Sequence, residues 1–448
     1  MLRGARIAGV VGAATAATAV TLLTGSGAAA PAARVSVAPA ADTYVTATRK
    51  KQNFGAARTL VAGPGSRARA FMRFDLRRQD AKVVRATLRV YAQRASKAAV
   101  TVGTVADSLW TERSVSYAQQ PKASGRVAVL RKLRRGWNSV DVTKATRGRY
   151  LVSLALGAAK SRVAVSSRES GAHGPRLVLQ TTPVATAPMV AAGDIAGCDT
   201  TGDEATAALV DTMPGTVAAL GDLVYEDATA SDFATCYAPS WGHFKARTRP
   251  AAGNHEYNSP GAAPYYAYFG AAAGDPAKGY YSYDAGSWHV VVLNSNCGVG
   301  GCDDNSPQVS WLRADLAAHP RFCTLAYWHH PRFSSGQIGS DAMTDGFWDA
   351  LYAARADLVV VAHDHDYERF APQRPKGQAD PKLGLREFVV GTGGRSHFVM
   401  GTPIANSEVR NDTTFGVLRL TLHAARYDWQ FVPVAGATFT DSGSGLCH

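Results

Sequence analysis

The feature that most constrains this chain is a series of apolar runs that each stop abruptly at a short polar cluster. Six lie between residues 189 and 365: MVAAGD, VAALGD, RPAAGN, HVVVLNSN, CTLAYWHH and LVVVAHDH. Such short apolar runs are typical of buried strands. Helical patterns separate several of them, including SPQVSWLRADLAAH with Pro307 near its start and TDGFWDALYAARA with Thr344 as its N-cap. The alternation predicts a layered α/β domain.

In such a domain, ligands bind beyond the carboxyl ends of the strands, so the polar clusters are expected to converge. The clusters supply, in chain order, Asp194, Asp222, Tyr225, Asn254, His255, His329, His363 and His365. Without His255, these residues form a mixed oxygen and nitrogen ligand set that is too large for one metal ion and sufficient for two. Between two of the runs, YYSYDAGSWHVVVLNS predicts a hairpin around residues 284–286.

The N-terminal half has a different pattern. Seven short alternating or β-branched runs recur between turn residues: FMRFDL, ATLRVYA, AVTVGTV, SVDVT, YLVSLAL, RVAVSSR and RLVLQ. Without a convincing helix among them, they predict an all-β sandwich over residues 35–181. The segment 182–188, rich in Pro and Thr, is predicted to be a linker to the domain at 189–448.

The net charge changes sign at the boundary between the two predicted domains. Residues 1–183 hold 31 Lys and Arg against 7 Asp and Glu, a net +24, and residues 184–448 hold 17 against 28, a net −11. A basic part of this kind suits a polyanion or a charged surface. Trp110, Trp137 and the arginines of RKLRRGW are candidates for sugar stacking and for contacts to phosphate, uronate or sulfate. The alternative places both tryptophans in the core and the arginines on a solvated face.

The N-terminus predicts export. Arg3 and Arg6 precede an apolar run, and small residues at 28–30 provide a cleavage context, so residues 1–30 are predicted to be a signal peptide. The alternative is a retained anchor, for which the run is short. Six cysteines suit an oxidising compartment. Cys297 and Cys302 flank a short glycine-rich loop, and the other four admit several connectivities, among them Cys198 with Cys236 and Cys323 with Cys447.

The polar clusters also resemble a known family. GDIAG, GDLVY, GNHE, HHP and AHDHDYER, followed by GTGGR at 391–395, are similar to the pattern of the calcineurin-like metallophosphoesterases. The purple acid phosphatases, with GDxG, GDxxY, GNHE, HxP and GHxHxYER, resemble the chain most within that superfamily. Tyr225 is present, and Ala196 stands where the broader superfamily has a ligand histidine. The resemblance spans residues 187–448 and implies a two-sheet αββα sandwich.

The resemblance implies a role for each residue. One metal would be held by Asp194, Tyr225 and His365, and a second by Asn254, His329 and His363, with Asp222 as a bridge. The ions implied are Fe(III) with Zn, Fe(II) or Mn(II), which would activate hydroxide for hydrolysis of a phosphate monoester. Asn254 and His255 would bind the substrate, and His255 would protonate the leaving oxygen as the catalytic residue.

Other residues near these motifs have weaker assignments. His330 is interpreted as structural, and residues 367–369 as a brace for the histidine loop. Asp364 either accepts a hydrogen bond from a ligand imidazole or is solvated. Ala196 and Ala362 replace glycines of the family pattern, so their turns are expected to avoid conformations that only glycine reaches.

The N-terminal runs resemble the DNRLRE domain, a jelly-roll family allied to carbohydrate-binding modules. ADTYVTA, FMRFDL, ATLRVYA, SLWTERSVSYAQQP and VAVSSRESGAHGPRLVLQ carry the resemblance over about residues 40–180. The hypothesis is therefore a secreted acid-phosphatase-type enzyme whose basic module attaches it to a glycan or an anionic cell-wall polymer. The alternatives are a phosphodiesterase acting on nucleotides or cell-wall polymers, and a glycan-binding protein with an inactive phosphoesterase domain.

Overall fold

The computed structural model describes residues 33–65, 67–158 and 160–448. The predicted signal peptide, residues 1–30, lies outside the described residues. No helix in the described part of the chain has the length and apolarity that a membrane crossing requires.

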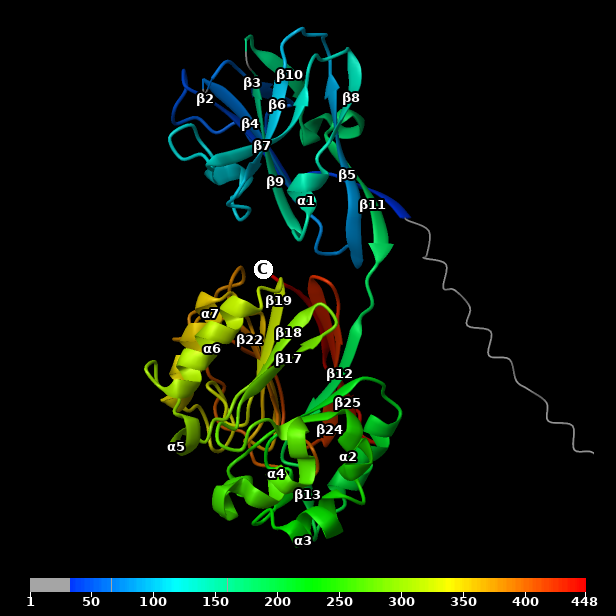
Figure 1. The fold of residues 1–448 in the computed structure, drawn as a ribbon, viewed down its shortest axis with the longest axis vertical. Coiled ribbons are helices and arrows are strands. Elements are labelled where there is room, and N and C mark those ends of the chain that lie inside the picture. Colours follow the sequence, from blue (N-terminus) through cyan, green and yellow to red (C-terminus); the bar gives the residue numbers. More distant parts are fainter. Residues whose placement is uncertain (1–32, 66, 159) are drawn as a thin grey trace, which may run out of the picture. The chain divides into compact units, whose positions relative to one another are not determined.

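The N-terminal part is all-β, as predicted, and consists of antiparallel sheets (Figure 1). A five-stranded sheet contains, in spatial order, β2 (Ala41–Thr46), β4 (Ala68–Asp75), β9 (Leu151–Ala158), β6 (Val100–Val105) and β7 (Ala123–Leu130). A four-stranded sheet contains β1 (Ala33–Val37), β11 (Arg176–Pro183), β5 (Ala81–Ala92) and β8 (Gly136–Asp141). The remaining strands are the pair β10 (Val163–Ser166) and β3 (Thr59–Ala62). The described helices of this part are the one-turn α1 (Thr143–Thr146) and two 3-10 helices, Glu112–Ser114 and Arg168–His173.

The two larger N-terminal sheets form a sandwich because alternate residues of both face one core. Met72 and Leu154 from the five-stranded sheet share an apolar cluster with Leu88 and Leu177 from the four-stranded sheet. All four side chains are fully buried. The all-β sandwich predicted from the short alternating runs is therefore present.

The C-terminal part contains two mixed sheets (Figure 1). The first contains β16 (Thr248–Ala251), β14 (Thr216–Leu220), β12 (Ala187–Ala192), β24 (Gly416–Leu422), β25 (Arg426–Pro433) and β26 (Ser442–Leu446). The second contains β17 (Tyr281–Ala285), β18 (Trp288–Val292), β19 (Cys323–Tyr327), β20 (Leu358–Val361), β22 (Arg386–Val390), β21 (Tyr367–Phe370) and β23 (Ser407–Asn411). β13 (Ala196–Gly197) and β15 (Val224–Tyr225) form a separate short pair.

Helices cover the outer faces of these two sheets. α6 (Pro307–Ala318) and α7 (Asp345–Ala353) pack on the seven-stranded sheet through a cluster that includes Leu312 and Phe347, and α2 (Gly202–Asp211) contacts β24. The inner faces of the two sheets share one large core. The shorter helices are α3 (Ala230–Asp232), α4 (Ala263–Phe269) and α5 (Cys297–Gly300). The layered α/β expectation is therefore confirmed.

Local expectations in this part hold with one exception. Ser306 accepts a hydrogen bond from the Val309 backbone N–H, at 3.3 Å, and Pro307 opens α6. β17 and β18 form the predicted hairpin. Thr344 precedes α7 as predicted, but its side chain does not cap the helix; its hydroxyl instead lies 3.5 Å from the Asp341 carbonyl oxygen.

Three disulfides link the six cysteines: Cys198–Cys236, Cys297–Cys302 and Cys323–Cys447. Of the segment predicted to be a linker, residues 182–183 belong to β11 and residues 187–188 to β12. Only residues 184–186 therefore lie between the two strands.

Candidate functional site

The strand topology explains why the polar clusters meet. β12, β14 and β16 run parallel to one another, and so do β18, β19 and β20. The motifs GD, GD, GN, HH and HDH therefore follow the carboxyl ends of strands in two sheets that share one core. Residues far apart in the sequence are brought to one place by this arrangement.

Three of the predicted ligands have an unusual backbone. Asp194, Asp222 and His363 have φ values of 57°, 49° and 74°, in the left-handed region that non-glycine residues seldom enter. Such conformations persist only where the surroundings hold them, and they cluster at functional sites. Ala196 and Ala362, the two replaced glycines, keep negative φ values, as expected.

The first half of the site is centred on the Tyr225 hydroxyl. This oxygen lies 2.8 Å from Asp194 Oδ1, 3.1 Å from Asp222 Oδ2 and 3.2 Å from His365 Nε2. A phenol has one proton and cannot donate to three neighbours at once. Burial and the Asp194 and Asp222 carboxylates raise the pKa of Tyr225 well above its ordinary value. The phenolate form would therefore need a cation at this place.

The second half begins at the same carboxylate oxygen. Asp222 Oδ2 also lies 3.2 Å from Nε2 of the fully buried His329. His329 Nε2 in turn lies 3.1 Å from Nδ1 of His363. The Asp222 oxygen is thus shared between the Tyr225 side and the His329 side, which is the position that a bridging ligand occupies.

Asn254 and His255 are the remaining predicted residues of the site. The buried Asn254 Oδ1 has no hydrogen-bond partner among the residues that the structure describes. The His255 backbone N–H donates to Asp222 Oδ1 at 2.9 Å, and its ring Nδ1 lies 2.6 Å from the Glu226 carbonyl oxygen. Because a carbonyl only accepts, Nδ1 carries the proton, and Nε2 is the nitrogen that lies 3.8 Å from Asp222 Oδ2.

Protonation in the cluster follows from its charges. Burial alone would raise the pKa of Asp222, but the neighbouring His329 imidazole and the His255 backbone hold it below its ordinary value. Burial of His329 would lower its pKa, but the neighbouring Asp222 carboxylate raises this pKa to about 9. Burial and the nearby His329 lower the pKa of His363 to about 4.

The residues present fit a pair of metal ions. A cation would satisfy both the unpaired Asn254 oxygen and the Tyr225 hydroxyl, which has two carboxylate oxygens and an imidazole nitrogen beside it. Hard oxygen donors gather around Tyr225, while imidazole nitrogens gather around His329. Asp194, Asp222 and His329 also form one of the side-chain groups compact enough to hold an ion. Six of the seven predicted ligands are therefore linked by short contacts in a setting that suits two cations, and the seventh, Asn254, has a buried oxygen without a described partner.

Several supporting residues were not recognised in the sequence. Ser396 Oγ lies 2.7 Å from His365 Nδ1, and Phe398 stacks on the His365 ring with centroids 3.9 Å apart. Arg395 lies over the Tyr225 ring and forms ion pairs with Asp199 and Glu226. The GTGGR segment was the signal that led toward this loop, but nothing in it indicated which ligand the loop contacts.

Glu256, in GNHE, was likewise given no role. Its buried carboxylate accepts hydrogen bonds from the backbone N–H groups of Asp222 at 2.9 Å, Leu223 at 2.8 Å and Gly253 at 2.6 Å. A side chain at Gly253 would collide with Asp222, so this glycine permits the close approach. Glu256 therefore holds together the two loops that carry Asp222 and Asn254.

Both interpretations of Asp364 were wrong. The carboxylate is fully buried and, among the residues that the structure describes, accepts no hydrogen bond from an imidazole; its donors are the Ser334 hydroxyl, the Ile338 N–H and the Gly339 N–H. Glu368 binds the same loop, through the Ser335 N–H and hydroxyl at 2.6 Å each.

His330 has a structural contact, as expected. Its Nδ1 lies 2.8 Å from Ser295 Oγ, and burial with the nearby His329 and His363 lowers its pKa to about 2. Its ring nevertheless lies beside the site, with its centroid 4.3 Å from that of His363.

Comparison with known proteins agrees with this geometry. Residues 188–367 match the family model of the calcineurin-like phosphoesterases, and residues 33–181 match carbohydrate-binding module family 96. The chain carries a calcineurin-like metallophosphoesterase domain related to the purple acid phosphatases. A module of carbohydrate-binding family 96 precedes it.

Two Arabidopsis thaliana proteins illustrate the relationship. Purple acid phosphatase 15 is 28% identical over 42% of this chain and 41% of its own length, and purple acid phosphatase 21 is 30% identical over 39% and 42%. The chain thus spans about two fifths of the length of these relatives. A solved purple acid phosphatase from yellow lupin (Lupinus luteus) seeds has a TM-score of 0.49 and 14% identity, covering 87% of this chain and 74% of that one.

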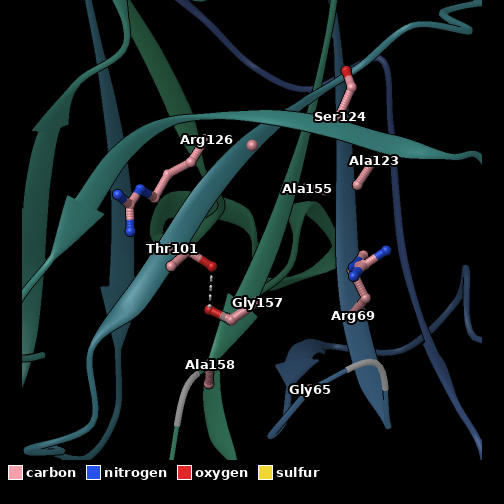
Figure 2. Close-up of a pocket in the computed structure, with 10 residues that line it drawn as sticks. Gly65, Arg69, Thr101, Ala123, Ser124, Arg126, Ala155, Gly157 and Ala158 are labelled. Atoms are coloured by element: carbon pink, nitrogen blue, oxygen red, sulfur yellow. Dashed lines mark hydrogen bonds between the residues drawn. The ribbon is translucent and has the colours of Figure 1, made fainter.

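The carbohydrate-binding module has a groove on its five-stranded sheet (Figure 2). Its volume is about 470 Å³, and small residues of β9 and β6, including Ala155, Gly157 and Gly103, form the floor. Arg69 on β4 and Arg126 on β7 flank that floor, because these strands lie on either side of β9 and β6.

The two candidate tryptophans of this module have different surroundings. Trp110 is 5% exposed, donates to the Ser153 hydroxyl and packs against Phe71, so it belongs to the core. Trp137 is 36% exposed and lies edge-on to Tyr91, with Arg89 over its ring. Of the two, only Trp137 is available for stacking on a sugar.

Proposed function

We propose that this protein is a secreted metal-dependent phosphoesterase that hydrolyses phosphate monoesters with two metal ions. The observation that carries the proposal is the position of Asp222 Oδ2, 3.1 Å from the Tyr225 hydroxyl and 3.2 Å from His329 Nε2. One set of ligands would be Asp194, Tyr225 and His365, and the other Asn254, His329 and His363. Bound ions would supply Lewis acidity toward the phosphoryl oxygens and toward a nucleophilic water.

The chain's own residues would orient the substrate and move a proton. His255 donates from Nδ1 to the Glu226 carbonyl, so Nε2 faces the site, and in the doubly protonated ring its proton can pass to the leaving oxygen. The His255 side chain is 22% exposed, which gives substrate access to it. Asn254, beside it, would share contact with the phosphoryl group.

The test compares a chromogenic phosphate monoester with the matching diester in the wild type and in Asp222→Asn. We expect metal-dependent monoesterase activity that falls about 10³-fold in the variant, because losing the shared ligand removes several kcal/mol of charge stabilisation. Asp211→Asn, at an exposed position, is the matched control. A higher kcat/KM for the diester would make the protein a phosphodiesterase. Absence of metal-dependent turnover would favour the glycan-binding alternative.

The ion identities are a separate part of the proposal. A phenolate and carboxylates are hard donors that suit Fe(III), and the set with an amide oxygen and two imidazoles suits Zn, Fe(II) or Mn(II). Fe(III) bound to Tyr225 predicts a broad visible charge-transfer band that Tyr225→Phe removes. A colourless protein that is fully metallated and active would assign another ion to this position.

We also propose that the module attaches the enzyme to an anionic glycan or cell-wall polymer. Arg69 and Arg126 flank the groove, and its small floor residues allow a polymer chain to approach the sheet (Figure 2). Arg69→Ala with Arg126→Ala should weaken binding to an anionic polysaccharide at low salt, while Arg131→Ala with Arg135→Ala should weaken it less. Equal losses from both pairs would instead indicate attraction to the net charge alone.

A further inference from the structure

A second group of metal-ligating side chains lies apart from the strand-end motifs. His289, Asp315 and His319 each place one ligand atom within 4.8 Å of the other two. His289 alternates along β18 with residues that face the inner core, so its ring points to the face that α6 covers. Asp315 lies in the last turn of α6, and His319 is the C-cap of that helix.

The contacts converge on the Asp315 carboxylate. Its Oδ2 lies 2.7 Å from His289 Nε2, and its Oδ1 lies 3.2 Å from His319 Nδ1. His319 Nδ1 lies closer, at 2.9 Å, to the Asp315 backbone carbonyl, to which it donates, so the His319 ring must turn to offer a nitrogen to an ion. The two imidazole rings are nearly parallel, with an interplanar angle of 15° and centroids 4.7 Å apart. Two ligand atoms about 2.1 Å from a tetrahedral ion lie about 3.4 Å apart, so the spacings of 2.7 and 3.2 Å, which are those of hydrogen bonds, would have to widen when an ion binds.

A fourth residue orients the buried histidine. Asp284 is the cross-strand partner of His289, and its Oδ1 lies 3.4 Å from His289 Nδ1. Histidines that bind metals commonly donate their second ring N–H to a carboxylate in this way, which leaves the other nitrogen free as a ligand. Here the other nitrogen is Nε2, which lies 2.7 Å from the accepting Asp315 Oδ2 and so must give up a proton before it can bind an ion.

The burial of the three side chains also suits a bound ion. The side chains of His289 and Asp315 are 1% and 7% exposed, whereas that of His319 is 46% exposed. Two ligands are therefore held in place within the fold, and the third can turn at the surface when an ion enters. Solvent can supply the remaining ligand.

We propose that His289, Asp315 and His319 form a third metal site, for Zn²⁺ or a similar divalent transition metal. Two imidazoles and one carboxylate are a common zinc donor set. The ion would connect the β17–β18 hairpin to the end of α6 and so stabilise this edge of the seven-stranded sheet. The site uses no residue of the strand-end cluster, and its occupancy can be measured independently of catalysis.

The experiment measures the metal content of the whole chain described above. Wild type, His319→Ala and His243→Ala are equilibrated with buffered Zn²⁺ and then analysed for metals per chain. His243 is an exposed histidine outside all the clusters described above, so it controls for loss of a surface imidazole. We expect His319→Ala to hold one zinc fewer than the wild type, and His243→Ala to match the wild type.

A second variant separates binding from folding. Asp284→Asn keeps the shape of the orienting residue and should weaken zinc affinity at this site about 10–100-fold, measured by competition with a chromogenic chelator. Equal metal content in the wild type and His319→Ala, with unchanged affinity in Asp284→Asn, would overturn the proposal. The three side chains would then form only a hydrogen-bonded cluster.

Discussion

The two halves of this chain place their charges in opposite ways. The metallophosphoesterase domain, net −11, buries carboxylates at strand ends, where Asp194 and Asp222 are 0% and 2% exposed. The carbohydrate-binding module, net +22 over residues 33–181, keeps groups such as Arg131 and Arg135 exposed. A buried charge needs a permanent partner, whereas an exposed one is neutralised by ions or by a polymer. The first arrangement suits a fixed cation centre, and the second suits an adaptable surface.

The largest expected effect is on catalysis by the metallophosphoesterase domain. His255→Gln should lower kcat/KM about 10²–10⁴-fold for an alkyl phosphate, whose leaving oxygen needs a proton. The loss should be much smaller for a nitrophenyl phosphate, whose leaving group does not. Steady-state kinetics with both substrates measure this, with the exposed His243→Gln as control. Equal losses with both substrates would assign His255 a purely structural role.

The next effect concerns the core of the module. Trp110→Ala should lower the free energy of unfolding by about 3–5 kcal/mol, because it removes a large buried ring and leaves a cavity. Trp137→Ala, at a half-exposed position of the same module, should cost about 1 kcal/mol or less. Denaturant titrations of the full chain compare the two. Similar costs would contradict the division of these tryptophans between core and surface.

A buried carboxylate in the module gives a pH dependence. Burial, with the nearby Glu169 and Glu112, raises the pKa of the fully buried Asp42 to about 7. In the unfolded chain Asp42 has its ordinary, lower pKa. At pH values between that pKa and about 7, the folded protein keeps a proton on Asp42 that the unfolded chain has released. The free energy of unfolding therefore falls as the pH rises through this range.

The matching variant is Asp42→Asn. Relative to it, the wild type should lose on the order of 2–3 kcal/mol of unfolding free energy between about pH 5 and pH 8. Denaturant titration at both pH values measures the difference, and Asp107→Asn, an exposed carboxylate of the module, should show none. A wild type and Asp42→Asn with the same pH dependence would show that Asp42 ionises normally.

The smallest expected effect is on the support of the metal loops. Glu256→Gln replaces an oxygen that accepts backbone hydrogen bonds with an NH₂ group that cannot, and should cost about 1–3 kcal/mol of stability. Weaker metal retention on dialysis should accompany this cost, because the carboxylate joins the loops of Asp222 and Asn254. The exposed Glu204→Gln is the control, and unchanged stability would remove Glu256 from this role.

Local patterns determined much of the fold. Strands of the module appear in the sequence as runs with period two, and strands of the second domain appear as short apolar runs. Both patterns reflect which residues of a single strand are buried, so they can be read from the sequence directly. Pro307 and Ser306 mark the start of α6 for the same reason, and the hairpin at β17–β18 needs only its own turn. The order of the polar clusters at strand ends was enough to predict which side chains would meet.

Only the tertiary structure decided what those side chains contact. It placed one oxygen of Asp222 between Tyr225 and His329, and it placed Asp364 against the Ile338 loop instead of an imidazole. It also buried Trp110 and left Trp137 exposed. Each of these outcomes depends on contacts between residues from separate helices, strands or loops. The pattern of residues within one segment does not show which distant segment will pack against it.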